Sequence, residues 1–158
     1  MYYQIESVLD ATGWQILEAL QEDARISFTE LGKRVGMSPP AVAERVRRLE
    51  EAGIITGYGA QVNLAKVGLP ITAIIRLTAT DDCQKVGLEI VQDIPEIFEC
   101  YRLTGADDYI LKVATTSIAG LEDLIDRVAG YGNCITSLVL SSPLSGRILR
   151  KDLIPMNS

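Results

Sequence analysis

The spacing of hydrophobic positions changes near the middle of the chain, from helical spacing before residue 62 to a mixture of strand and helix spacing after residue 70. The first helical stretch runs from Leu9 to Leu20 behind Asp10, a residue that caps helix N-termini. Gly13 lies in this stripe and weakens its first turn. The pattern predicts a helix that packs on the two that follow through Leu9, Ile16, Leu17 and Leu20.

Two more helices are predicted between Ser27 and Gly53. Ser27 and Glu30 have the spacing of a capping box, and Gly36 ends the first helix. Ser38 caps the second helix, with a proline at its first position. The buried stripes are predicted to be Phe28, Leu31 and Val35 in the first helix and Val42, Val46 and Leu49 in the second. Two capped helices joined by so short a turn predict a helix-turn-helix.

The outer face of the second helix carries side chains that need not pack. They are Pro40, Ala41, Glu44, Arg45, Arg47 and Arg48. Arginines on such a face can contact phosphates and base edges, and the free helix N-terminus can hold a phosphate. The alternative is an ordinary surface helix whose arginines pair with Glu44, Glu50 and Glu51. Because both caps and the tight turn occur together, we expect DNA binding by Lys33, Arg34, Ser38, Pro40, Ala41, Glu44, Arg45 and Arg48.

After the third helix, residues 55–62 alternate in hydrophobicity, which is typical of the strand in a winged helix-turn-helix. Residues 63–70 contain Gly68 and Pro70 and are predicted to be a linker. We therefore expect a DNA-binding domain over 1–62, a linker over 63–70 and a second domain over 71–158.

The second half predicts strand, helix, strand, strand, helix, strand. The strands are 71–80, 97–104, 109–116 and 135–140, with a short edge strand at 147–149. One helix follows a cap at Asp81 or Asp82 and buries Cys83, Val86, Gly87, Ile90, Val91 and Ile94. The other follows Ser117 and buries Ile118, Leu121, Leu124, Ile125 and Val128. This order predicts an α+β fold with a ferredoxin-like βαββαβ sandwich.

Helices cover only one face of such a sheet, yet the strand residues that point to the other face are also largely apolar. The residues predicted on this second face are Ile74, Phe98, Cys100, Ile110, Ala114, Ile135 and Val139. Something else must cover that face, and a second copy of the same sheet is the simplest candidate.

Composition narrows the function. The 158 residues have a net charge of -6, but five cations and one anion between Lys33 and Arg48 give that stretch a local charge of +4. The chain has no histidine, and Cys83, Cys100 and Cys134 are not in metal-ligand spacing, so we expect no enzyme activity, no metal and no cofactor. The first residues lack a signal-peptide pattern, and no membrane span is present, so we expect a cytoplasmic protein.

The chain resembles the Lrp/AsnC family of bacterial and archaeal transcription regulators, also called feast/famine proteins, from Leu9 to about Leu149. The matching residues are Leu9-Asp10, Ile16-Leu17, Leu20-Gln21, Arg25-Ile26-Ser27, Leu31, Met37-Ser38-Pro39, Val42, Arg45-Val46, Arg48-Leu49, Gly53-Ile54-Ile55 and Gly57-Tyr58. Gly105, Asp108 and Tyr109 match a shorter signature in the second half.

The resemblance implies a winged-helix DNA-binding domain and a ferredoxin-like regulatory domain that dimerises through its sheet, with dimers assembling into tetramers or octamers. It also implies an amino-acid effector between dimers, near Gly105, Ala106, Asp107, Asp108, Tyr109, Thr136 and Ser137. Two residues depart from the family pattern. Gly13 replaces a frequent aspartate, and Ala106 replaces a polar or aromatic residue, which leaves the effector open.

Two other functions compete with that of a transcription regulator. Some haem-biosynthesis decarboxylases are similar to this family in both domains, but they are expected to use histidine, which this chain lacks. A stand-alone amino-acid-binding module would not need arginines between Ser38 and Leu49, and they are present. The sequence thus favours a DNA-binding transcription regulator.

Overall fold

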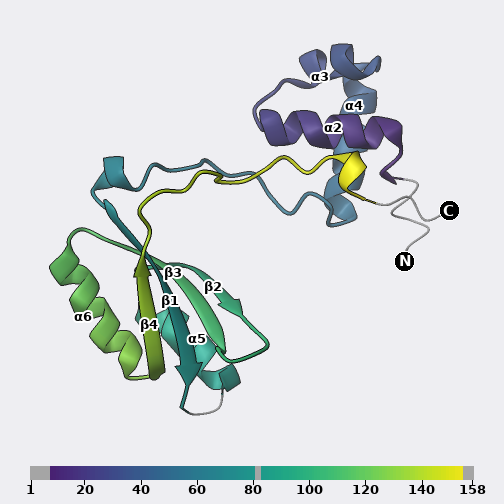
Figure 1. Cartoon of the computed structure of the whole chain (residues 1–158). Helices are drawn as coiled ribbons and strands as arrows, with labels where there is room; N and C mark the ends of the chain where they lie inside the picture. Colours follow the sequence, from purple (N-terminus) through teal and green to yellow (C-terminus); the bar gives the residue numbers. More distant parts are fainter. Residues whose placement is uncertain (1–7, 81–82, 155–158) are drawn as a thin grey trace. The chain divides into compact units, whose positions relative to one another are not determined.

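The computed structural model describes residues 8–80 and 83–154. These residues form two compact units (Figure 1). One unit consists of residues 8–60 together with 144–154, and the other of residues 61–143. None of the helices in the described ranges is both long and apolar enough to cross a membrane.

The first unit contains the three predicted helices, α2 (Ala11–Glu22), α3 (Phe28–Val35) and α4 (Pro39–Glu51). Their buried side chains form one cluster: Ile16, Ala19, Leu20, Leu31, Val42, Val46 and Leu49. The helical spacing of these residues places them on facing sides of the three helices, and their burial stabilises the bundle. Phe28 is an exception to the prediction, because it begins α3 and remains 43% exposed.

The predicted caps explain where the helices begin. The Gly13 N–H donates to the Asp10 carboxylate at 2.8 Å, and the Glu30 N–H donates to the Ser27 hydroxyl at 3.1 Å. Gly13 itself is required by a close approach, since a Cβ there would lie 2.2 Å from the Val8 carbonyl oxygen. Gly13, which was expected to weaken the first turn of α2, therefore allows the Val8 backbone to pass close to the helix.

The strand expected after the third helix, which would form the wing, is absent from the described residues. Residues 55–62 form no strand, although their alternation predicts one. A strand requires a partner, and no segment within the described residues pairs with this one. Gly57 and Gly59 also provide no side chains for cross-strand contacts. Ile54 and Ile55 instead pack against the helical cluster.

The end of the chain differs from the prediction in two ways. Residues 147–149 form no edge strand, and between residues 144 and 154 the regular structure is the short 3-10 helix η2 (Lys151–Leu153). Residues 144–154 also group with the first unit, whereas the predicted second domain extended to residue 158. The backbone of Leu149 hydrogen-bonds with the side chain of Gln21 on α2, which removes it from any sheet edge.

The second unit has the predicted order of elements after a 3-10 turn, η1 (Ala65–Val67). They are β1 (Ile71–Ala79), α5 (Cys83–Asp93), β2 (Ile97–Arg102), β3 (Tyr109–Thr115), α6 (Ile118–Ala129) and β4 (Gly132–Leu138). The sheet order is β2-β3-β1-β4, and every neighbouring pair is antiparallel. This confirms the ferredoxin-like βαββαβ fold. Ser117 caps α6, while the predicted cap at Asp81 or Asp82 lies outside the described residues.

The core of this unit lies between the sheet and the two helices. It includes Ala73, Ile75, Leu77, Ile90, Ile94, Leu111, Val113, Leu124 and Val128. Three predicted positions differ. Val91 on α5 is 43% exposed, and Ile118, the first residue of α6, is 57% exposed. Cys100 packs on the helix side because the pairing shifts between Ile97 and Glu99.

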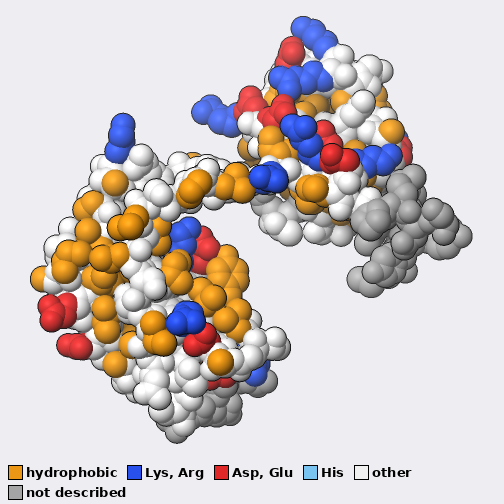
Figure 2. All heavy atoms as spheres, in the orientation of Figure 1, with side chains coloured by type: hydrophobic (Ala, Val, Ile, Leu, Met, Phe, Trp, Pro, Cys, Tyr) orange, Lys and Arg blue, Asp and Glu red, His pale blue; other side chains and the backbone are white. Residues whose placement is uncertain are grey.

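The opposite face of the sheet carries Ile74 and Arg76 on β1, alternating with the buried residues of that strand. Phe98, Tyr101 and Ile135 are each about half exposed there. Figure 2 shows hydrophobic side chains gathered over this unit, with a few charged ones among them. The prediction of an uncovered apolar face is therefore confirmed for the single chain.

Candidate functional site: the α4 surface and the β2–β3 hairpin

The turn between α3 and α4 depends on two glycines. Gly36 ends α3 in the left-handed conformation, with φ 69° and ψ 33°. The Met37 N–H donates to the Gly32 carbonyl at 2.9 Å, and a Cβ at Gly32 would lie 2.5 Å from the Met37 carbonyl oxygen. The two helices therefore meet closely enough to form the compact helix-turn-helix predicted from the caps.

The N-terminal end of α4 is exposed. Ser38 and Pro40 lie at its surface, and Ala41 is half-buried. The Ser38 side chain makes no capping hydrogen bond, so its hydroxyl does not compensate the first N–H groups of the helix. This end therefore offers small side chains and backbone donors to an anion such as a phosphate.

Behind that end, Glu44 joins two arginines on the outer face of α4. It accepts a bidentate pair of hydrogen bonds from Arg47, at 2.8 and 2.9 Å, and one from Arg48 at 2.9 Å. These bonds, with Arg47 first, lower the pKa of Glu44 to about 2. Arg47 also pairs with Glu51, and the pKa of Arg47 is raised by both carboxylates.

These are the pairs that the alternative of an ordinary surface helix predicts. All four side chains are exposed, and exposed pairs contribute little because water and salt compete with them. Phosphate can therefore displace the carboxylates from Arg47 and Arg48 at small cost. Arg47 lies on the outer face but was left out of the expected set, although its spacing from Glu44 and Glu51 indicates the shared face.

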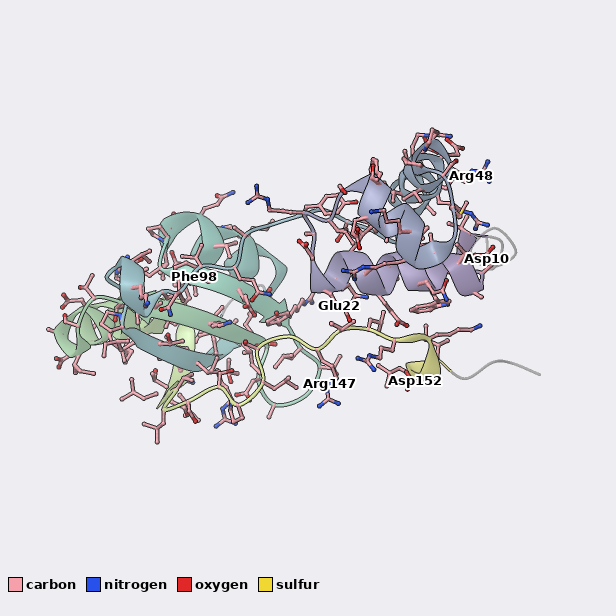
Figure 3. All side chains as sticks on the ribbon, turned by 90° about the horizontal axis from the view of Figure 1, so that it is seen from above. Asp10, Glu22, Arg48, Phe98, Arg147 and Asp152 are labelled. Atoms are coloured by element: carbon pink, nitrogen blue, oxygen red, sulfur yellow. The ribbon has the colours of Figure 1, made fainter. Side chains whose placement is uncertain are left out.

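Arg45 is placed differently from the other arginines. Its guanidinium donates to the second carboxylate oxygen of Asp10 at 2.8 Å, and its side chain is only 25% exposed. This hydrogen bond is the main reason that the pKa of Asp10 is lowered. Figure 3 marks Asp10 at the start of α2 and Arg48 on α4. Arg45 thus joins α4 to the cap of α2, a contact that helical spacing within α4 could not reveal.

The two cations at the end of α3 lie at the surface. Lys33 pairs with Glu30, and Arg34 pairs with Glu22 on α2, each at 3.7 Å. Their side chains are 73% and 47% exposed. These long contacts leave both cations able to approach a phosphate.

Tyr58 is a surface contact that the sequence analysis did not assign to the site. Its hydroxyl donates to Glu50 on α4 at 2.8 Å, and burial together with that carboxylate raises the pKa of Tyr58 to about 12. An aromatic residue between Gly57 and Gly59 was the available signal. The contact holds the segment after α4 against the helix.

In the second unit, the β2–β3 hairpin is held against β1 by Asp108. The Asp108 carboxylate accepts from the Ala79 N–H at 2.9 Å, and its own N–H donates to the Leu77 carbonyl at 2.9 Å. Thr78 donates from its hydroxyl to the Ala106 carbonyl at 3.3 Å. Asp108 therefore positions the hairpin, and its carboxylate is already in use.

Asp107 is more available to a ligand. Its carboxylate lies 3.5 Å from the Arg76 guanidinium, which projects from the uncovered face of β1. Gly105 has φ 125°, a conformation that favours glycine and shapes the loop. The hairpin and β1 therefore present a carboxylate and a guanidinium side by side.

The remaining expected effector residues do not share one surface. Tyr109 is 4% exposed and packs against α5, where its hydroxyl lies at the position that a Cβ on Gly87 would need. The register pairs Thr136 with Ile75 on the helix side of the sheet and Ser137 with Ile74 on the uncovered side. Consecutive strand residues point to opposite faces, so these two hydroxyls cannot complete one polar end.

The thiols described by the structure show no reactive setting. Cys100 and Cys134 are free and partly buried, and burial raises the pKa of both. In the described ranges, no three His, Cys, Asp or Glu side chains gather closely enough to hold a metal ion.

Comparison with known families matches both units. Residues 9–50 match the AsnC-type helix-turn-helix domain, and residues 72–149 match the Lrp/AsnC ligand binding domain. The chain is 38% identical over 133 residues to the HTH-type transcriptional regulator LrpC of Bacillus subtilis, covering 84% of this chain and 92% of that protein. It is 35% identical to the leucine-responsive regulatory protein of Salmonella typhimurium, covering 84% and 85%.

Solved structures agree. The structure of B. subtilis LrpC superposes with a TM-score of 0.80 at 36% identity, covering 87% of this chain and 99% of that one. A Neisseria meningitidis transcriptional regulator in complex with L-Met superposes with a TM-score of 0.82 at 31% identity, covering 92% and 99%. These relatives are named as transcription regulators, which favours that function over the decarboxylase alternative.

Proposed function

The chain belongs to the Lrp/AsnC family of transcription regulators, and from this we propose that it regulates transcription by placing α4 in the major groove of a specific DNA site. The observation that carries the proposal is the outer face of α4. Its N-terminal end is small and exposed, and Arg47 and Arg48 follow on the same face, held only by exposed carboxylates. This arrangement suits phosphate contacts at the helix end and base contacts along the groove.

Within this proposal, the cations have different roles. Arg48 and Arg47 contact DNA from α4, while Lys33 and Arg34 neutralise phosphates from α3. The small side chains at the N-terminal end of α4, those of Ser38, Pro40 and Ala41, let the helix approach the DNA closely. Glu44 releases its arginines to the DNA or accepts a hydrogen bond from a cytosine. Arg45 remains on Asp10 and sets the position of α4 rather than reading a base.

The test compares Arg48→Ala with Lys85→Ala, which removes one positive charge from α5 in the other unit. A selected operator and a random duplex of equal length are titrated by fluorescence anisotropy. Loss of a base contact should weaken operator binding by about 1 to 3 kcal/mol and relax specificity, while Lys85→Ala should bind as wild type does. Normal binding of both duplexes by Arg48→Ala would remove it from the interface.

Relatives of this chain are named leucine-responsive, and one was solved with L-methionine. We propose that this chain also answers to a small amino acid, held at the hairpin of Gly105, Ala106, Asp107 and Asp108. The Asp107 carboxylate suits the ligand's ammonium group, and the neighbouring Arg76 suits its carboxylate. Ser137 lies on the face of Arg76 and can add a hydroxyl, whereas Tyr109 and Thr136 support the site from the core side.

Calorimetric titration of the twenty amino acids tests this site. Asp107→Asn keeps the size of the side chain but removes the charge, so it should weaken binding of the amino acid that wild type prefers. Asp108→Ala is the less useful change, because it also frees the hairpin from β1. Unchanged affinity in Asp107→Asn would place the ligand elsewhere, and no binding by wild type would refute an amino-acid effector.

A further inference from the structure

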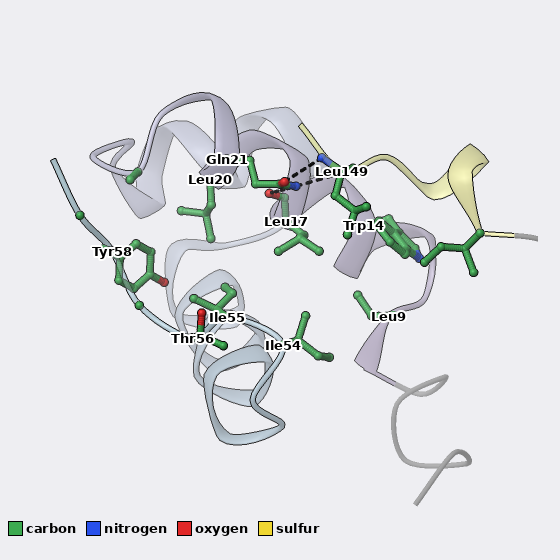
Figure 4. Close-up of a pocket in the computed structure, with 14 residues that line it drawn as sticks. Leu9, Trp14, Leu17, Leu20, Gln21, Ile54, Ile55, Thr56, Tyr58 and Leu149 are labelled. Atoms are coloured by element: carbon green, nitrogen blue, oxygen red, sulfur yellow. Dashed lines mark hydrogen bonds between the residues drawn. The ribbon is translucent and has the colours of Figure 1, made fainter. Parts of the chain in front are cut away.

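The last described residues of the chain lie along α2, and Gln21 holds them there. The Gln21 side-chain amide donates to the Leu149 carbonyl at 3.0 Å, and its carbonyl accepts from the Leu149 N–H at 2.8 Å (Figure 4). One turn earlier on α2, Glu18 accepts from the Lys151 N–H at 3.4 Å. Figure 3 shows the segment with Arg147 and Asp152 running beside α2. The Gln21 amide thus satisfies both the N–H and the carbonyl of Leu149, as the backbone of a neighbouring strand would.

An apolar surface accompanies these hydrogen bonds. Leu149 and Ile154 line a cavity of about 350 Å³ together with Trp14, Leu17 and Leu20 of α2. Leu149 remains 46% exposed, so burial alone holds the segment weakly and the paired hydrogen bonds decide its position.

The segment is also covalently continuous with the regulatory domain. The chain leaves the second unit after Pro143 and enters the first unit at Leu144, a few residues after β4 ends at Leu138. The two units are therefore joined twice, by this segment and by the linker near residue 61. Without the Gln21 contact, only the linker would limit how far the DNA-binding unit moves.

We propose that the outer face of α2, formed by Trp14, Leu17, Glu18 and Gln21, is a docking surface for the chain's own segment 149–154. Docking makes this segment a second link between the regulatory and DNA-binding domains. The inference rests on the proposed function in one respect: in a two-fold assembly, a second link restricts the distance between the two copies of α4. It thereby raises the effective concentration of the second copy at a paired site.

The link can reach the recognition helix through packed side chains. Ile16 and Leu20 of α2 share a core with Val42 and Val46 of α4. A restraint on α2 is therefore a restraint on α4, because the three helices move as one packed body.

Docking itself is tested without DNA, on the full-length chain. Trypsin cuts after Arg147 and Arg150, which flank Leu149, and a docked backbone resists cleavage. Gln21→Ala should speed cleavage at both bonds about 5- to 30-fold, the range expected for the loss of both hydrogen bonds to Leu149, while cleavage after Lys66 in the linker stays unchanged. Gln21→Glu keeps the hydrogen-bond acceptor and loses the donor, so its cleavage rate should lie between those of wild type and Gln21→Ala. Gln15→Ala, the same change at an exposed position on α2, should match wild type.

Trp14 provides a second readout, since it is the only tryptophan in the chain and is 6% exposed beside the segment. Acrylamide should quench its fluorescence more strongly in Gln21→Ala than in Gln15→Ala. Equal cleavage rates and equal quenching in these two variants would overturn the docking surface.

The second link is tested on duplexes that carry one or two half-sites. Gln21→Ala should lower affinity for the paired site about 5-fold and leave affinity for the single half-site unchanged. Equal affinities for the paired site in Gln21→Ala and Gln15→Ala would overturn the link even if docking is confirmed. If wild type binds no duplex at all, the proposed function fails, and the link to α4 fails with it, while the trypsin result still decides the docking surface.

Discussion

Asp10 uses its two carboxylate oxygens for two different helices. One oxygen accepts from the Gly13 N–H and begins α2, and the other accepts from Arg45 on α4. The sequence predicts the first contact, because capping is a local signal that spans three residues. It does not predict the second, which joins residues 35 positions apart and appears only after the helices pack. Helical spacing alone therefore places Arg45 with the DNA-binding residues, and whether it contacts DNA stays a prediction.

Two changes at Asp10 separate these contacts. Asp10→Asn keeps a capping oxygen but loses the ion pair, so we expect a loss of about 0.5 kcal/mol, the range of a partly exposed pair. Asp10→Ala also loses the cap and should cost about 1 kcal/mol more. Thermal unfolding of both variants at neutral pH measures the difference, and Asp123→Asn on the exposed side of α6 serves as the control.

The same pair predicts a pH dependence. The pKa of Asp10 is below its ordinary value of 3.8 in the folded chain, so its charge stabilises the fold above pH 3.8. That stabilisation is lost as the pH falls through the lower folded value. The stability difference between wild type and Asp10→Asn should therefore shrink below pH 3.8, and a constant difference would exclude the ion pair.

At the scale of elements, the helical and strand spacing predicts nearly all of the fold. Periodicity works well for α2, α3 and α4 because each has one buried stripe, and for the βαββαβ unit because each strand and helix packs on one shared core. It fails at residues 55–62 and 147–149, because alternation reports which side chains are apolar but not whether another strand is available to pair.

Packing between elements also decides what a glycine does. Gly87 on α5 faces Tyr109 on β3, and an added Cβ would lie 2.2 Å from the tyrosine hydroxyl. Gly120 on α6 meets nothing closer than 3.5 Å. The sequence predicts Gly87 to be buried, but it cannot show that a tyrosine from another strand fills the space above it.

The same substitution at these two glycines should have opposite effects. Gly87→Ala should destabilise the chain by about 1 to 3 kcal/mol through overpacking. Gly120→Ala should stabilise it by up to about 1 kcal/mol, because alanine favours the helix. Denaturant unfolding of the two variants measures both signs. A stabilised Gly87→Ala would mean that Tyr109 can leave its position at little cost.

At the scale of the whole molecule, a second copy of the chain would bury the uncovered, largely apolar face of the sheet. Ile74, Ile110 and Ile135 lie there, and the pairs formed by Arg76 with Asp107 and by Lys112 with Glu99 accompany them. Relatives in this family act as regulators, and we propose that two copies meet through this face. A dimer also supplies two copies of α4, which a single short helix needs to read a long site.

A charge placed on that face should separate the copies. Ile110→Glu puts a second carboxylate beside Arg76, which already pairs with Asp107, so the proposed interface would bury an uncompensated negative charge. Light scattering at micromolar concentration should show a lower mass than for wild type. Leu88→Glu, at a position 67% exposed on α5, should leave the mass unchanged. A stable wild-type monomer would contradict the interface.

Sequence-specific recognition by paired α4 helices is the central claim, and selection from a random pool of DNA duplexes tests it most directly. Wild-type protein should enrich a motif made of two inverted half-sites, with centres about one or more helical turns apart. Arg48→Ala should enrich the same motif with weaker preference at the bases that Arg48 reads. A pool that stays random after several rounds with wild-type protein would contradict the account.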